Sequence, residues 1–226
     1  MLPNDPKHIL IEARSMFNDY DTSIRIIKLD VYRAKKKKIA KTPFGYMDVI
    51  YNSLGKPIIA GGIDPKGNSR HYFYRDNDWI EITRDNPLYK MTPLSLNNDG
   101  SKLYLSSHVD QGTETLFEYT FANKKLTKIF HHEISDILQL IKNPQTGTVV
   151  GVEVMPGYFE YHYVDKENVF AKEHAKLAKA FSGNDIQITS TTKNQKVMVV
   201  LVESDKNAGD YYLYNKENSS LYEMDV

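Results

Sequence analysis

His71-Tyr72-Phe73-Tyr74 and Leu116-Phe117-Glu118-Tyr119 are two copies of one short aromatic segment whose recurrence predicts the fold. Five such segments occur, and their last residues are Leu29, Tyr74, Tyr119, Tyr163 and Tyr214. These residues lie 45, 45, 44 and 51 positions apart. Because aromatic rings pack well on a pleated, half-buried surface, each segment is typical of a β-strand.

A second series of apolar runs precedes the first by one strand and has nearly the same period. Its members are Ile9-Leu10-Ile11, Ile58-Ile59-Ala60, Leu103-Tyr104-Leu105, Val149-Val150-Gly151 and Val197-Met198-Val199-Val200. All but the first follow segments rich in Gly or Asn, which supply the positive φ angles of tight hairpins. A repeat of about 40 to 50 residues with four short strands is typical of a β-propeller blade.

The period predicts an all-β fold, a β-propeller of about five four-stranded blades in a single domain, residues 1–226. The expected blades are roughly 1–43, 44–88, 89–133, 134–183 and 184–226. Strands are expected near 45–51, 57–62, 70–75 and 79–83 in the second blade, and near 91–96, 102–107, 115–120 and 126–130 in the third. Because residues 7–10 already match the second strand of the other blades, the first blade lacks one strand, and nineteen are expected in all. This favours an arc of a larger propeller, whose exposed blade edges could pair with a second copy.

One segment departs from the strand pattern. Between residues 166 and 181, apolar or aromatic side chains recur at helical spacing, namely Phe170, His174, Leu177 and Phe181. Charged residues lie off that stripe, namely Lys172, Glu173, Lys176 and Lys179. The pattern predicts one amphipathic helix inserted in the fourth blade.

Composition excludes several classes of function. The 226 residues contain 29 Lys plus Arg and 29 Asp plus Glu, so the chain has no net charge to attract nucleic acid or an anionic membrane. We therefore predict neither as a partner. The absence of Cys excludes disulfides, thiolate catalysis and zinc sites with sulfur ligands. No run of apolar residues approaches a membrane span, and the compartment, cytoplasmic or periplasmic, stays open.

Three parts of the chain resemble a known family. They are the opening Leu2-Pro3-Asn4-Asp5-Pro6-Lys7-His8-Ile9-Leu10-Ile11, the strand Ile27 to Tyr32 with Tyr74-Arg75 and Trp79, and the last third from Ala180-Phe181-Ser182-Gly183 through Val199-Val200-Leu201 to Gly209-Asp210-Tyr211. Together they resemble the propeller of prolyl oligopeptidase family serine peptidases, particularly bacterial acylaminoacyl-peptidase and dipeptidyl-peptidase relatives.

The resemblance implies a propeller that covers the active site of an α/β-hydrolase domain and admits only short peptides. In that family the catalytic Ser, Asp and His all lie in the hydrolase domain. The nucleophile elbow needs Gly-x-Ser-x-Gly, and none of the twelve glycines forms it here. We therefore assign no catalytic residue to the chain. A standalone propeller that binds a protein or peptide is the alternative, and a propeller lyase or glycosidase is a weaker third possibility.

The nearest approach to a metal motif is His131-His132-Glu133-Ile134-Ser135-Asp136. A zinc-binding His-Glu-x-x-His needs a helix, whereas this segment falls between two blades, so we predict a polar linker. Gly62 to Ser69 has glycines spaced as in a phosphate loop but joins two strands, which predicts a hairpin turn. The sequence thus predicts no metal-binding and no cofactor-binding residue.

The remaining candidates have simple structural explanations. The basic run Lys35 to Lys38 predicts a solvated turn, and Asp76-Asn77-Asp78 predicts a turn rather than a calcium site. Trp79 is expected to pack between blades. The histidines His71, His108, His162 and His174 stand singly in the sequence and are interpreted as structural or surface residues.

Overall fold

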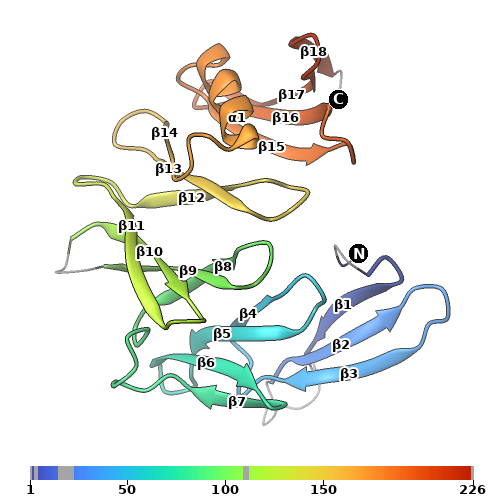
Figure 1. The fold of residues 1–226 in the computed structure, drawn as a ribbon, viewed down its shortest axis with the longest axis vertical. Helices are drawn as coiled ribbons and strands as arrows, with labels where there is room; N and C mark the ends of the chain where they lie inside the picture. Colours follow the sequence, from blue (N-terminus) through green and yellow to red (C-terminus); the bar gives the residue numbers. More distant parts are fainter. Residues whose placement is uncertain (1, 3–4, 15–22, 109–111, 225–226) are drawn as a thin grey trace. The chain divides into compact units, whose positions relative to one another are not determined.

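The chain folds as five consecutive antiparallel sheets, the blades of a β-propeller, with one short helix (Figure 1). The computed structural model describes residues 2, 5–14, 23–108 and 112–224. Pro3 and Asn4 of the opening motif lie outside the described residues. The predicted all-β propeller class is confirmed, and neighbouring strands in each sheet are also neighbours in the chain.

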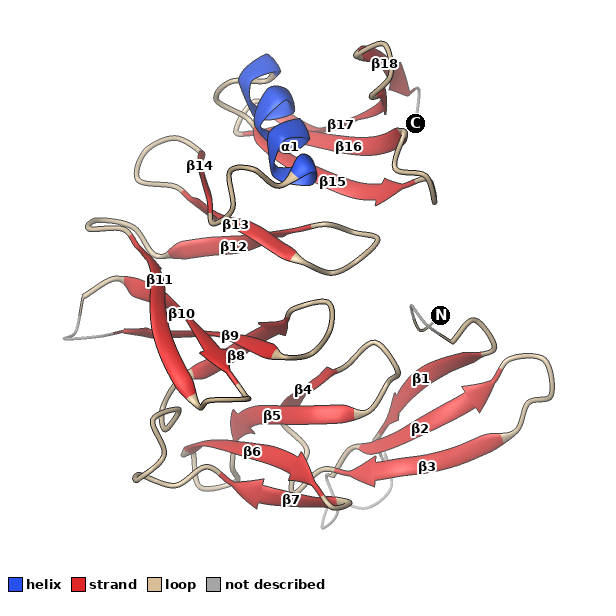
Figure 2. Cartoon of the chain, viewed as in Figure 1, coloured by secondary structure: helices blue, strands red, loops and turns tan. Residues whose placement is uncertain are grey.

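The first three sheets contain eleven strands (Figure 2). The first sheet consists of β1 (His8–Ala13), β2 (Arg25–Asp30) and β3 (Lys36–Lys41). The second consists of β4 (Met47–Tyr51), β5 (Pro57–Ile63), β6 (Ser69–Arg75) and β7 (Asp78–Glu81). The third consists of β8 (Thr92–Leu96), β9 (Lys102–His108), β10 (Glu114–Thr120) and β11 (Lys125–His131).

The last two sheets contain the remaining strands and the helix. The fourth consists of β12 (Ile137–Lys142), β13 (Val149–Val154) and β14 (Glu160–Tyr163), followed by α1 (Val169–Ala180). The fifth consists of β15 (Asp185–Thr191), β16 (Val197–Ser204), β17 (Asn207–Asn215) and β18 (Ser220–Met224).

The observed strands of the second and third blades agree with the predicted ranges within two residues. The first blade has three strands among the described residues, as predicted. The fourth blade differs from the prediction, because α1 follows its third strand where a fourth strand was expected. The described part of the chain therefore has eighteen strands instead of nineteen.

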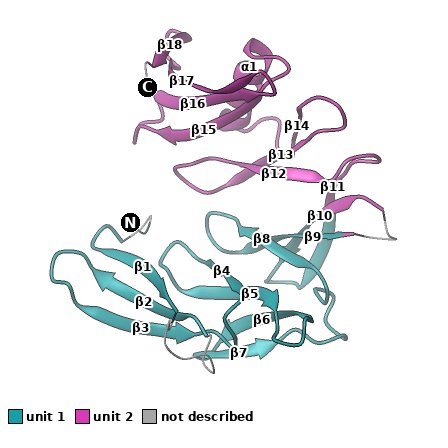
Figure 3. Ribbon diagram, turned by 180° about the vertical axis from the view of Figure 1, so that it is seen from behind, with its two compact units in different colours: residues 1–107, 117–128 teal, residues 108–116, 129–226 magenta. Residues whose placement is uncertain are grey.

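The chain divides into two compact units, coloured separately in Figure 3. Unit 1 comprises residues 1–107 and 117–128, and unit 2 comprises 108–116 and 129–226. Each unit has its own apolar core. In unit 1 the second and third sheets share a core that includes Ile59, Phe73, Leu103 and Leu105. In unit 2 the fourth and fifth sheets pack with α1.

The hairpin turns of the second blade form where the sequence predicts them. Between β5 and β6 the Oδ1 atom of Asp64 accepts hydrogen bonds from the backbone N–H groups of Lys66 and Asn68, both at 2.9 Å. Between β6 and β7, Asp76 and Asn77 have φ angles of 51° and 65°, which suit a two-residue hairpin turn. Both the phosphate-loop pattern and the Asp-Asn-Asp pattern therefore lie in hairpin turns, as the sequence predicts.

Helix α1 begins at a standard cap and buries one face. The side chain of Asn168 accepts hydrogen bonds from the N–H groups of Phe170 (2.9 Å) and Ala171 (3.4 Å). The helix buries Phe170, His174 and Leu177, as the helical spacing predicts. It also buries Glu173, which the pattern placed on the solvent face. Within the described residues no helix has the length and apolarity needed to cross a membrane.

Candidate functional site

A cavity of about 710 Å³ in unit 1 lies between the first two sheets, and we call it the lysine pocket. Its charged and aromatic lining consists of Lys28, Lys37, Lys38, Lys41, Lys56, Asp78, Tyr74 and Trp79. Strands β2 and β3 supply four of the lysines, and the turn between β4 and β5 supplies Lys56. The aromatic residues come from the facing blade, where Tyr74 on β6 pairs with Trp79 on β7.

The two aromatic side chains of the pocket are held by hydrogen bonds to the neighbouring blade. The rings of Tyr74 and Trp79 lie 4.9 Å apart between centroids, at 57°. The hydroxyl of Tyr74 donates to the carbonyl of Ile39 (3.1 Å), and Nε1–H of Trp79 donates to the carbonyl of Lys41 (2.9 Å). Because both polar groups are satisfied, the rings present a preorganised apolar surface to the pocket. The prediction that Trp79 packs between blades is confirmed.

The lysine pocket concentrates positive charge in a chain that has none overall. Five lysines line it against one aspartate, and Lys28 is paired with Asp5 at 2.5 Å. The side chains of Lys37, Lys38 and Lys56 are exposed. The prediction of a solvated turn at residues 35–38 is wrong in part, because Lys36 to Lys38 belong to β3. Although exposed, Lys37 and Lys38 line a pocket whose volume is typical of small-ligand sites.

Unit 2 contains a buried pair of carboxyl groups, Glu153 on β13 and Asp185 on β15. The Oε2 atom of Glu153 accepts a hydrogen bond from Nε2 of Gln139 at 2.5 Å. Its Oε1 atom and the Oδ1 atom of Asp185 are buried without a hydrogen-bond partner among the described residues. Burial, with a smaller contribution from the nearby Asp185, raises the pKa of Glu153 to about 7. A proton shared between the two carboxyl groups satisfies both oxygens.

The surroundings of the carboxyl pair favour a structural role. Glu153 borders a cavity of only about 140 Å³, also lined by Lys142 and His174. Burial lowers the pKa of Lys142 and lowers that of His174 to about 4, so the histidine is neutral and bonds the Tyr163 hydroxyl at 2.8 Å. Carboxyl groups close enough to share a proton are nearer than the roughly 5 Å needed by a retaining glycosidase. The pair does not have glycosidase geometry.

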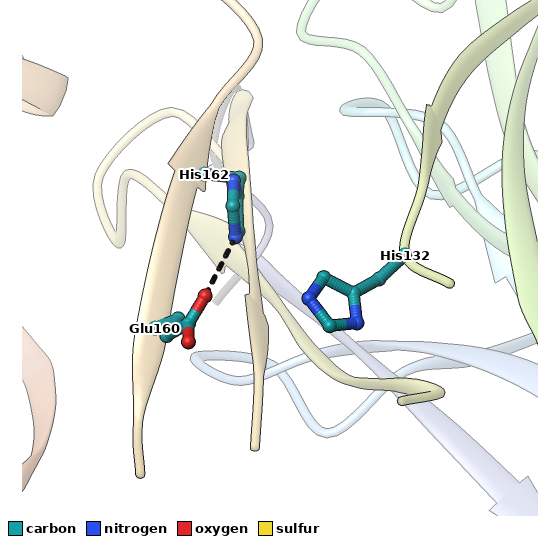
Figure 4. Close-up of side chains that lie close together, drawn as sticks. All are labelled: His132, Glu160 and His162. Carbon is teal, nitrogen blue, oxygen red and sulfur yellow. Dashed lines mark ion pairs between the residues drawn. The ribbon is translucent and has the colours of Figure 1, made fainter. Parts of the chain in front are cut away.

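The third candidate site, also in unit 2, brings together His132, Glu160 and His162 (Figure 4). One ligand atom from each residue lies within 4.8 Å of the others. His132 directly follows β11, whereas Glu160 and His162 stand two apart on β14 and so share a strand face. The interpretation of His132 as a linker residue and of His162 as a solitary histidine is therefore incomplete. The Glu-x-His spacing in a predicted strand was the available signal.

Comparisons with known proteins support the propeller fold. No protein-family model and no curated protein sequence matches the chain. Solved structures match across nearly all of it. A prolyl endopeptidase is 8% identical with a TM-score of 0.50, over 97% of this chain and 40% of that one.

Two TolB structures match as well. TolB from Acinetobacter baumannii is 12% identical with a TM-score of 0.48, over 97% of this chain and 51% of that one. A putative TolB from Agrobacterium tumefaciens is 10% identical with a TM-score of 0.49, over 98% and 77%. The chain thus spans about half the length of the Acinetobacter protein and two fifths of the prolyl endopeptidase. At 8% identity, the similarity to the prolyl endopeptidase concerns the fold alone.

Proposed function

We propose that this chain is a non-catalytic β-propeller that binds short peptides in the lysine pocket and admits them to a prolyl oligopeptidase-like hydrolase domain. The observation that carries the proposal is the pocket itself, where lysines surround a fixed aromatic pair. A peptide offers both matching features, since its carboxylates are anionic and its side chains and backbone have apolar faces.

The size and charge of the pocket favour a short anionic peptide over other ligands. A volume of about 710 Å³ suits a ligand of a few residues. The local excess of lysines raises the local concentration of anions, although the chain as a whole is neutral. Single-stranded nucleic acid binds along extended basic grooves with successive stacking platforms, and the pocket offers one compact site.

The link to a hydrolase domain is supported by the extent of the match to a prolyl endopeptidase. That match covers 97% of this chain but only 40% of the larger enzyme. The 226 residues contain no Gly-x-Ser-x-Gly nucleophile elbow, so the proposed catalysis belongs to another domain. Because propellers serve many functions, the proposed association with a hydrolase domain rests on similarity of fold.

The proposal is tested by titrating the protein with a short acidic peptide while following tryptophan fluorescence. Trp79 is the single tryptophan of the chain and lines the pocket, so its emission reports occupancy without a label. The probe is acetyl-Glu-Glu-Glu-amide, and acetyl-Gln-Gln-Gln-amide is its uncharged counterpart. We expect saturable quenching or enhancement with the acidic peptide, weakening as salt is added.

Charge reversal tests whether the peptide binds in the lysine pocket. The double variant Lys37→Glu/Lys38→Glu should lower the affinity about 10-fold or more, equivalent to about 1.4 kcal/mol. Lys66→Glu reverses an exposed lysine of the same unit that does not line the pocket, and it should leave affinity unchanged. Equal losses in both variants, or tighter binding of a short oligothymidylate than of the peptide, would contradict the proposal.

A further inference from the structure

We infer that His132, Glu160 and His162 form a binding site for a divalent transition-metal ion, with Zn²⁺ as its natural occupant. Two imidazole nitrogens and one carboxylate oxygen are a ligand set that Zn²⁺ prefers, and three protein ligands leave a fourth position open. This site shares no residue with the lysine pocket, so the inference does not depend on peptide binding.

The three ligand atoms lie close together in the structure. They lie within 4.8 Å of one another, and a tetrahedral zinc ion requires separations of about 3.4 Å. The side chains of His162 and Glu160 are 40% and 48% exposed, so rotamer adjustments can close this gap. The same exposure gives an ion a path from solvent.

An independent observation is the buried ring nitrogen of His162. Its Nε2 atom is shielded from solvent and has no hydrogen-bond partner among the described residues. The Oε2 atom of Glu160 lies 3.5 Å from this nitrogen, which is too long for a good hydrogen bond. A buried nitrogen without a partner costs free energy, and an ion between it and the carboxylate removes that cost.

The neighbours of the two histidines orient them toward this point. The ring of His162 packs against Phe130 of β11, with centroids 4.9 Å apart and ring planes tilted by 42°. The carbonyl of His132 accepts a hydrogen bond from the Thr113 hydroxyl, which holds the backbone where β11 ends. Figure 4 shows the imidazole of His132 pointing toward Glu160 and His162.

Coordination of a metal at Nε2 of His132 requires a change of tautomer. The Nδ1 atom accepts a long hydrogen bond, 3.4 Å, from the backbone N–H of Ile134, which places the proton of the neutral ring on Nε2. When Nε2 coordinates a metal, the proton of the neutral ring resides on Nδ1, and this weak contact is lost. The loss is small, because a hydrogen bond of that length contributes little.

The site is tested by isothermal titration of the purified, chelator-treated protein with ZnCl₂. We expect one Zn²⁺ per chain, and Co²⁺ in its place should give the visible absorption of a tetrahedral ion. The variants His132→Ala, Glu160→Gln and His162→Ala should each weaken binding more than about 10-fold, since even residues that merely support ligands contribute 10- to 100-fold.

His8→Ala is the matched control. His8 is also paired with a carboxylate, Asp5 at 2.7 Å, but belongs to unit 1 and not to the cluster. The His8→Ala variant should bind Zn²⁺ as tightly as the unmodified protein. Circular dichroism of each variant verifies that a loss of binding is not a loss of fold. The inference would be overturned if each of the three single variants, correctly folded, still bound Zn²⁺ as tightly as the unmodified protein. It would also be overturned if His8→Ala weakened binding as much as those variants do.

Discussion

The second and fourth blades begin from the same repeat but complete it in different ways. The second ends with β7, which pairs with β6 through backbone hydrogen bonds. In the fourth, α1 follows β14 and contacts β13, β14 and β15. A helix cannot extend the ladder of a sheet, so side chains must connect it to its neighbours. A helix can therefore take the place of the fourth strand of a blade when the polar side chains of the helix find partners in the core.

The placement of charge differs accordingly between the two blades. In the second blade Arg70 forms surface ion pairs with Asp64 (3.2 Å) and Glu81 (2.5 Å). In the fourth, Glu173 is buried and accepts a hydrogen bond from the hydroxyl of Tyr214 at 3.0 Å and from Lys176 at 2.9 Å. The fourth blade therefore depends on a buried carboxylate, whereas in the second blade Arg70 and Glu81 keep their charged side chains partly exposed.

The largest effect is expected from emptying the core beneath α1. Leu177 is 2% exposed, and Leu177→Ala should lower the free energy of unfolding by about 2–5 kcal/mol. Lys179→Ala, on the exposed side of the same helix, should change it by less than about 0.5 kcal/mol. Urea denaturation measures both. Similar small values for the two variants would mean that α1 is not part of the unit 2 core.

A pH-dependent effect is expected from the buried carboxyl pair. Because the pKa of Glu153 is raised to about 7, the native state retains a proton that the unfolded chain loses. The resulting stability is present at low pH and is lost as pH rises from about 4.5 to about 7. Glu153→Gln mimics the protonated form without titrating.

Relative to the unmodified protein, the Glu153→Gln variant should therefore gain stability with increasing pH. The gain should be near zero at about pH 4 and reach about 3 kcal/mol above about pH 8, following 1.36 kcal/mol per pKa unit. Denaturation at several pH values measures it. A difference that is constant with pH would show that the pKa of Glu153 is not raised.

A smaller effect is expected from the cap of α1. Asn168→Ala removes the side-chain acceptor for two backbone N–H groups and should cost about 1 kcal/mol. Asn168→Asp keeps the acceptor and should be nearly neutral. Thermal unfolding distinguishes them, and equal losses would contradict a capping role.

The smallest effect is expected from the surface network of the second blade. Arg70→Met should cost less than about 1 kcal/mol, because the side chain is 40% exposed and its ion pairs are screened by solvent. Urea denaturation in low and high salt measures the remaining electrostatic part. A loss as large as that of Leu177→Ala would remove the contrast between the blades.

The sequence predicted the features that depend on local pattern, which are the strands and the helix. It missed the features that depend on contacts between neighbouring repeats. The period of aromatic and apolar runs located the strands, and helical spacing located α1. Glu173 was misplaced because a helix packed against more than one strand buries a wider face than its apolar stripe. The lysine pocket and the cluster around His132 each join residues from different repeats, a proximity that no spacing within one repeat encodes.

The role proposed for this propeller is to serve a prolyl oligopeptidase-like hydrolase. Reading the source genome in frame on both sides of the segment that encodes residues 1–226 distinguishes this role from that of a standalone propeller. We expect an adjoining in-frame segment with Gly-x-Ser-x-Gly followed by the Asp and His of a hydrolase triad. A frame that closes at both ends without such a segment would contradict it and leave a standalone peptide-binding propeller.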